Sequence, residues 1–183
     1  ALFVHSLLKL PARCRAVELK EACYAGTAGL QLAAAAIARQ PAKKALVIGA
    51  DVARYDLRSS GEPTQGAGAV AMLVSTAPRI LALDAEAGLY AEDVMDFWRP
   101  NYRDEALVDG KYSMRVYLTA LCAAWQQYTA LSGRKFEDLH RFCYHLPFTK
   151  MAEKAHVKLS REAGLPEPDK ARLEREVGES LRY

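Results

Sequence analysis

Apolar and polar residues in the first part of the chain follow three local patterns, each typical of a different element. Residues 17–20 alternate apolar and charged side chains, which predicts a short strand. An Ala-rich segment then runs to about Arg39 and predicts a long helix, which Pro41 ends. The apolar run at residues 44–51 predicts a buried strand, because it is preceded by lysines and ends in glycine and aspartate.

The pattern changes after this strand. Turn-forming residues dominate positions 58–68, so we expect a loop there. Two apolar runs follow, at residues 69–74 and 80–83, and each predicts a strand. The order strand, helix, strand, loop, strand indicates an α/β protein with a largely buried sheet.

The second half of the chain begins with residues 85–110, which have no clear period and predict a long irregular connection. Helical spacing of apolar residues then predicts a helix over 112–131. Residues 141–145 have the pattern of a further strand, and Thr149 is the expected N-cap of the next helix. A charged helix is expected from Asp169.

Composition and charge argue against two classes of binding partner, nucleic acids and membranes. The chain is 51% hydrophobic and 26% charged, with a net charge of +3, as in an ordinary soluble globular domain. Its lysines and arginines are scattered and form no continuous basic face, so we expect no nucleic-acid partner. The longest apolar stretch, residues 30–38, is too short to cross a bilayer, so we expect no membrane partner.

The cysteines and the two ends of the chain lead to further expectations. Four cysteines occur without a CxxC pair or a His/Cys cluster at zinc spacing, so we expect no metal site. Reduced thiols in a cytoplasmic protein are expected, because the chain is no small cysteine-dense secreted scaffold. The sequence lacks an initiator methionine, a signal peptide and a polar tail, and we expect it to be an internal piece of a longer chain.

Cys23 is the candidate nucleophile. It follows the first predicted strand and opens the Ala-rich helix, and its neighbours Ala22, Ala25 and Gly26 are small. The positive end of a helix stabilises a thiolate, and small neighbours let an acyl thioester approach the sulfur. The alternative is a small buried cysteine, which is how most free cysteines behave. The local surroundings leave both interpretations open.

A thiolate nucleophile usually works with an imidazole, and His145 is the candidate because it ends an apolar run before Pro147. A lone histidine is nevertheless more often structural. Lys150 and Lys154 lie four residues apart on one helix face, where they suit a phosphate. A solvated lysine face is the alternative.

Five segments together resemble the 3-hydroxy-3-methylglutaryl-CoA synthase family of the thiolase superfamily, in its bacterial form. They occur in the family's order and span most of the chain. They are EACYAGTA at 21–28, GEPTQGAGAVA at 61–71, DFWRP at 96–100, VDGKYS at 108–113 and YHLPFTKM at 144–151.

The resemblance implies a thiolase-like α/β fold, with a mixed sheet and helices on both faces, that is incomplete in this chain. Residues 1–183 would form a single partial domain, without the start and the completion of the family fold. It also implies an acyltransferase of the mevalonate pathway that condenses acetyl-CoA with acetoacetyl-CoA through an acetyl-cysteine. No cofactor is implied, and a homodimer is.

The resemblance also assigns roles to individual residues. Cys23 would carry the acetyl group, and His145 would help to activate the ketone of the acetoacetyl group. The remaining positions would contact substrate or CoA (Thr64, Ser113, Lys150, Lys154) or support the site with an acidic side chain (Asp51, Asp96).

Two parts of the family's catalytic site have no counterpart here. The family's general-base glutamate lies further upstream of the cysteine than this chain extends, and Glu18 and Glu21 are too close in sequence to replace it. A downstream segment that completes the pocket is also absent. We therefore expect the 183-residue chain to be inactive alone.

Two alternatives to this function are considered. One is the related synthase that takes its acyl group from an acyl carrier protein and adds β-branches to polyketides. Thr149, Lys150 and Lys154 favour free CoA instead, because lysines suit its phosphates. The other is a non-catalytic scaffold of the same fold, which the presence of both Cys23 and His145 disfavours. Ketoacyl synthases lack the segment at 144–151 and are disfavoured as well.

Overall fold

The computed structural model describes residues 1–181, which fall into two compact units. The first consists of Ala1–Val52 and Ala67–Ala82, and the second of Ala53–Gly66 together with the chain from Leu83 onward. That the whole chain forms one partial domain stays a prediction.

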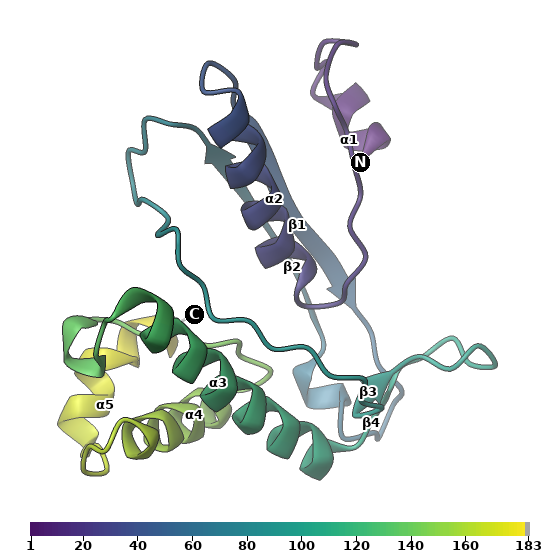
Figure 1. The fold of residues 1–183 in the computed structure, drawn as a ribbon. Coiled ribbons are helices and arrows are strands. Elements are labelled where there is room, and N and C mark those ends of the chain that lie inside the picture. The colour runs from purple at the N-terminus through teal and green to yellow at the C-terminus, as the bar shows by residue number, and fades with distance from the viewer. Residues whose placement is uncertain (182–183) are drawn as a thin grey trace. The chain divides into compact units, whose positions relative to one another are not determined.

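The first unit is a helix packed on a two-stranded sheet. Its elements are α1 (Leu2–Leu7), α2 (Ala25–Arg39), β1 (Ala45–Ala53) and β2 (Gly66–Val74). The arrows of β1 and β2 point in opposite directions, and α2 lies along them (Figure 1). Gly29 permits this close packing, because a β-carbon there would lie 3.1 Å from Cγ1 of Val47 in β1. Ala33 and Ile37 are the buried side chains of α2.

The sheet of this unit is less buried than the apolar runs predict. In β1, half-buried residues alternate with exposed ones, and Leu46 and Ile48 are both exposed. Most of β2 is exposed, including Val70 and Leu73. A continuous apolar run therefore forms a strand with one covered face, as period-2 geometry requires when a helix packs on one side only.

The second unit is mainly helical. Short elements come first: the 3₁₀ turn η1 (Glu62–Thr64) and the strands β3 (Phe97–Trp98) and β4 (Leu107–Val108), which pair antiparallel. The helical part follows, with α3 (Gly110–Ser132), η2 (Phe136–Asp138), α4 (Thr149–Glu162), α5 (Lys170–Glu176) and η3 (Gly178–Leu181). Helices α3 and α4 pack against each other (Figure 1).

The ends of the long helix α3 have clear local causes. Asp109 caps its start by accepting a hydrogen bond from the backbone N–H of Tyr112 at 3.0 Å. Gly133 ends it in the left-handed conformation, with φ of 70°, and donates its N–H to the carbonyl of Thr129. Gly88 passes directly over the helix, where an added β-carbon would lie 1.8 Å from the carbonyl oxygen of Ala124.

The core of the second unit lies between α4, α5 and the residues that follow α3. Phe136, Phe142, Leu159 and Val177 form its buried cluster. The rings of Phe136 and Phe142 stack with centroids 4.6 Å apart. Helix α4 contributes a stripe of buried residues at helical spacing (Met151, Ala152, Ala155, His156, Leu159 and Ser160).

Three predicted strands do not form. Residues 17–20, 80–83 and 141–145 are irregular, so within residues 1–181 the sheets are the pairs β1–β2 and β3–β4 rather than a mixed sheet with helices on both faces. Val17 and Ile80 are well exposed, at 65% and 96%. A short apolar run becomes a strand only when a neighbouring strand accepts its hydrogen bonds, and these runs have no such neighbour.

Candidate active site

Cys23 lies in the first unit and is exposed, two positions before α2 begins. The N-cap residue of the helix is Tyr24, whose side chain makes no capping hydrogen bond. The first backbone N–H groups of α2 therefore lack a side-chain cap close to the thiol. The position fits the predicted nucleophile, whereas the alternative of a small buried cysteine does not describe it.

A tight turn presents this cysteine. The N–H of Tyr24 donates to the carbonyl of Glu21 at 3.0 Å, and the N–H of Ala25 donates to the carbonyl of Ala22 at 3.3 Å. Ala22 has φ of 43°, in the left-handed region that a residue with a β-carbon rarely occupies. Backbone strain of this kind clusters at functional sites, where the surrounding structure holds it in place.

In the second unit, Asp96 and Ser113 flank the start of α3. The carbonyl of Asp96 accepts the N–H of Asp109, the capping residue, at 2.9 Å. Ser113 lies in the first turn, where its N–H donates to the carbonyl of Asp109 at 2.8 Å. Both predicted residues are half-buried. The backbone of Asp96 is thus bonded to the backbone of the residue that caps α3.

His145 lies in the irregular segment after η2, and its side chain is exposed. Its carbonyl accepts a hydrogen bond from the hydroxyl of Tyr117, at 3.2 Å, one turn beyond Ser113 on α3. Partial desolvation by the surrounding chain lowers the pKa of the His145 imidazole, so the ring is mainly neutral at neutral pH. A neutral imidazole can both accept and donate a proton.

Lys150 and Lys154 lie on α4, and both are exposed. The Nζ of Lys154 is 3.7 Å from Sδ of Met114, the neighbour of Ser113. The helix starts one residue earlier than predicted, since Phe148 is the N-cap and makes no side-chain hydrogen bond. The prediction of Thr149 as the cap is therefore wrong. Ser113 lies in the first turn of α3, and both His145 and Lys154 contact this helix, the first through Tyr117 and the second through Met114.

Thr64 and Asp51 both make local hydrogen bonds. The hydroxyl of Thr64, in η1, donates to the carbonyl of Gly61 at 2.7 Å, which closes the turn. Asp51 lies in the first unit and is exposed. It does not end β1, which continues to Ala53, and its Oδ1 accepts the N–H of Val52 at 2.9 Å.

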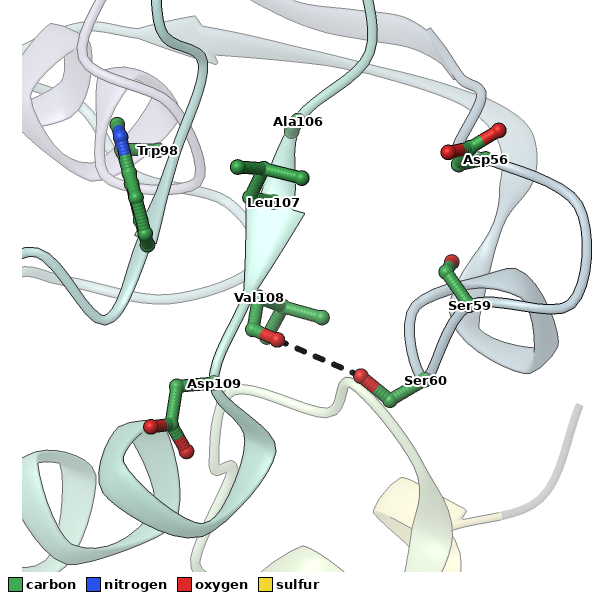
Figure 2. A pocket seen from close by; sticks show the side chains of 8 residues that line it. All are labelled: Asp56, Ser59, Ser60, Trp98, Ala106, Leu107, Val108 and Asp109. Atoms are coloured by element: carbon green, nitrogen blue, oxygen red, sulfur yellow. Dashed lines mark hydrogen bonds between the residues drawn. The ribbon is translucent and has the colours of Figure 1, made fainter.

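A cavity of about 430 Å³ lies beside the paired strands β3 and β4 (Figure 2). Its lining is mixed, with an indole, aliphatic side chains and polar side chains (Asp56, Ser59, Ser60, Trp98, Ala106, Leu107, Val108, Asp109). The hydroxyl of Ser60 donates to the carbonyl of Val108 at 3.5 Å. The cavity adjoins the cap of α3 through Asp109, and none of the predicted site residues lines it.

Sequence reasoning missed a buried polar network beside His145. His156 is fully buried, and its Nδ1 lies 2.9 Å from the hydroxyl of Tyr144. Its Nε2 lies 2.8 Å from Oε2 of Glu176, whose Oε1 accepts Nε of Arg172 at 3.0 Å. Burial lowers the pKa of His156 more than Glu176 raises it, so the ring is neutral. The spacing of Arg172 and Glu176 on α5 was the available signal.

Replacing His156 by leucine should destabilise the protein by about 1–3 kcal/mol, because the hydroxyl of Tyr144 and one oxygen of Glu176 lose a buried partner. Urea unfolding followed by circular dichroism measures the change. His140→Leu, at an exposed histidine, is the matched control and should shift the unfolding free energy by less than about 0.5 kcal/mol. Equal effects of the two substitutions would contradict a structural role for the network.

Residues 1–181 contain neither a candidate metal site nor a candidate membrane span. Within residues 1–181, no group of three or more His, Cys, Asp or Glu side chains is placed to hold a metal ion. None of the helices in this range is long and apolar enough to span a membrane.

The chain is similar to proteins of known family and structure, which identify the class of protein. Residues 17–88 match the family described as 3-oxoacyl-[acyl-carrier-protein] synthase III, and residues 81–180 match hydroxymethylglutaryl-coenzyme A synthase C terminal. The solved structure of MvaS in complex with 3-hydroxy-3-methylglutaryl coenzyme A superposes with a TM-score of 0.87 at 41% identity, over 96% of this chain and 49% of that one. The fold is thiolase-like and partial, as predicted.

The chain belongs to the hydroxymethylglutaryl-CoA synthase family, which confirms the resemblance. It is 42% identical over 183 residues to hydroxymethylglutaryl-CoA synthase of Enterococcus faecalis, over 100% of this chain and 47% of the relative. It is 37% identical over 175 residues to polyketide biosynthesis 3-hydroxy-3-methylglutaryl-ACP synthase PksG of Bacillus subtilis (strain 168), over 87% and 41%. The chain spans about half the length of the curated relatives it matches.

Proposed function

We propose that this chain carries catalytic residues of an acyltransferase that condenses acetyl-CoA with acetoacetyl-CoA to 3-hydroxy-3-methylglutaryl-CoA. The observation that carries the proposal is the exposed thiol of Cys23 at the uncapped start of α2. Support comes from the 42% identity, along all 183 residues, to a hydroxymethylglutaryl-CoA synthase. We assign this activity to a protein that contains these residues and has the length of the relatives. This protein is the full-length enzyme.

The first step is transfer of the acetyl group to Cys23. The thiolate attacks the carbonyl carbon of acetyl-CoA, an S–C bond forms, and CoA leaves as its thiolate and takes up a proton. Backbone N–H groups at the start of α2 can stabilise the oxyanion that develops on the carbonyl oxygen. The turn with Ala22 holds the sulfur at this end of the helix.

The second step forms the carbon–carbon bond. A base removes a proton from the acetyl methyl group, and the resulting enolate attacks the ketone carbon of acetoacetyl-CoA. The resemblance assigns the base to a glutamate upstream of these residues. His145 interacts with the acetoacetyl group and polarises the ketone oxygen, which becomes an alkoxide and takes up a proton. Water then hydrolyses the thioester to Cys23 and releases the product.

The remaining predicted residues bind substrate. Lys150 and Lys154 are exposed cations on one face of α4 and suit the phosphates of CoA. Ser113 and Thr64 contribute hydroxyl groups, and Asp51 and Asp96 support the site. We further propose that the full-length enzyme is a cytoplasmic homodimer of the mevalonate pathway, which leads to isoprenoids, and requires no cofactor.

A second candidate is the carrier-protein-dependent reaction of polyketide β-branching. The observation that favours it is the 37% identity to a 3-hydroxy-3-methylglutaryl-ACP synthase. The exposed pair Lys150 and Lys154 favours free CoA, because two cations on one helix face complement a phosphorylated nucleotide.

Donor preference separates the candidates. When the full-length enzyme is offered acetyl-CoA and acetyl-carrier protein at equal concentration, we expect Cys23 to be acetylated mainly by acetyl-CoA. Intact-protein mass spectrometry with differently labelled acetyl groups measures the ratio. Predominant acetylation by the carrier protein would favour the polyketide function. A protein that neither donor labels would be a non-catalytic scaffold of this fold.

A further inference from the structure

Tyr144 and His145 are neighbours in the chain but lie in different environments. Tyr144 is half-buried and its ring stacks on Phe142, with centroids 6.1 Å apart and 11° between the planes. The side chain of His145 is exposed. The segment contains no regular secondary structure, so no helix or sheet ladder holds the backbone that carries the imidazole. Other contacts must fix its direction.

Tyr117 supplies one of these contacts. Its hydroxyl donates to the carbonyl oxygen of His145 at 3.2 Å from the middle of a regular helix, α3. Burial raises the pKa of the Tyr117 hydroxyl to about 12, so it remains a donor throughout the neutral range. The same helix carries Ser113, one turn earlier, so this bond ties His145 to the element that holds a predicted substrate contact.

Tyr144 supplies the second contact through the buried network. Glu176 is an acceptor, so Nε2 of the neutral His156 carries the proton and Nδ1 accepts from the Tyr144 hydroxyl, at 2.9 Å. Arg172 holds the carboxylate of Glu176 from α5, and its guanidinium also lies 3.4 Å from the hydroxyl of Ser160. The ring of Tyr144 is therefore fixed at its far end to both α4 and α5.

We propose that Tyr117 and Tyr144 are positioning residues for His145, which fix the backbone on either side of its side chain with two tyrosine hydroxyls. Tyr117, on α3, holds the carbonyl of His145. Tyr144, the residue before His145, is held in turn by His156. Neither tyrosine needs to touch the substrate. The inference rests on the proposed function, in which His145 acts on the acetoacetyl group in the condensation but not in the acetylation of Cys23.

The two half-reactions provide the test, in the full-length enzyme. Tyr117→Phe removes one hydroxyl group and keeps the ring. We expect condensation to slow about ten- to a hundredfold, because a small displacement of a catalytic group costs that much. Acetylation of Cys23 and the KM for acetyl-CoA should change by less than about twofold, because neither depends on an interaction made by His145. Rapid-quench measurements of acetyl-enzyme and of product separate the two rates.

Tyr128→Phe is the matched control. It makes the same chemical change on the same helix, about 16 Å further along its axis, and should leave both rates unchanged. Condensation at the wild-type rate in Tyr117→Phe would overturn the proposal. An equal loss of acetylation and condensation would overturn it too, because that result indicates general damage to the fold.

A spectroscopic readout keeps the inference separate from the proposed function. In ¹³C-histidine-labelled full-length enzyme, the Cε1–H signal of His145, assigned with His145→Ala, should broaden or shift in Tyr117→Phe and in Tyr144→Phe but not in Tyr128→Phe. An unchanged signal in the first two variants would refute the positioning role. If the unsubstituted enzyme forms no 3-hydroxy-3-methylglutaryl-CoA, the proposed function fails and this spectrum alone decides the inference.

Discussion

Replacing Cys23 by alanine is expected to abolish acetyl transfer in the full-length enzyme, with residual turnover on the order of 10⁴- to 10⁶-fold below that of the unsubstituted protein. The loss is large because no covalent acetyl-enzyme can form, and both later steps depend on that intermediate. Incubation with radiolabelled acetyl-CoA, followed by denaturation and counting of protein-bound label, measures the first step. Formation of 3-hydroxy-3-methylglutaryl-CoA measures the whole reaction.

The control for this substitution is Cys14→Ala. Cys14 is also an exposed free cysteine of the first unit, but it precedes no helix start of this kind. Its replacement should leave labelling and turnover unchanged. Label that persists in Cys23→Ala and disappears in Cys14→Ala would move the nucleophile to the other cysteine and refute the proposed mechanism.

Replacing His145 by alanine should have the second largest effect. We expect condensation to fall about 10²- to 10⁴-fold, the range for loss of a group that assists proton transfer. Acetylation of Cys23 should continue, so acetyl-enzyme accumulates when acetyl-CoA and acetoacetyl-CoA are both present. The amount of acetyl-enzyme distinguishes two causes of a slow reaction. A damaged fold would lower this amount, whereas the loss of a catalytic group that acts only in condensation raises it.

The histidine substitution also has an internal control. His140 lies five positions earlier in the same part of the chain and is exposed like His145. His140→Ala should condense at the unsubstituted rate. If His145→Ala were acetylated no better than Cys23→Ala, His145 would be needed for the first step, and its assignment to the ketone of acetoacetyl-CoA would be wrong.

The helices were predictable because their signals are local. The Ala-rich run predicts α2, and its end before Pro41 is the one observed. Apolar spacing and a following glycine predict α3, whose C-cap is Gly133 in the left-handed conformation. Asp169, at the predicted start of the last helix, is the N-cap of α5 and accepts the N–H of Arg172 at 2.8 Å. Each of these signals acts within a few residues of the chain.

The strands were less predictable because pairing is not local. Residues 80–83 have the composition of a strand, yet Ile80 is 96% exposed and no strand within residues 1–181 pairs with it. Residues 141–145 fail for another reason. The N–H of Phe142 donates to the carbonyl of Glu176 in α5, so the segment packs against a helix instead of a strand. Cys143, in the same segment, is exposed.

In the candidate site, too, local features were predictable from the sequence and non-local contacts were not. Motif resemblance was enough to select Ser113, His145 and Lys154. Ser113 lies on α3, and the backbone of His145 and the side chain of Lys154 contact this helix. The residues that hold His145 were not selected, because Tyr117 and His156 are distant in sequence from it or from their partners. A hydrogen bond between residues far apart in the sequence leaves no periodic pattern in a single sequence.

The bond between Tyr144 and His156 has a consequence for how this protein can change during evolution. Loss of either partner leaves the other without its hydrogen bond, which is costly, whereas an apolar pair of similar size costs less, because only Glu176 loses a partner and it keeps Arg172. Single replacements at the two positions should therefore be selected against more strongly than the double replacement. Sequences that descend from a common ancestor with this chain should keep the two positions both polar or both apolar, and mixed pairs should be short-lived intermediates.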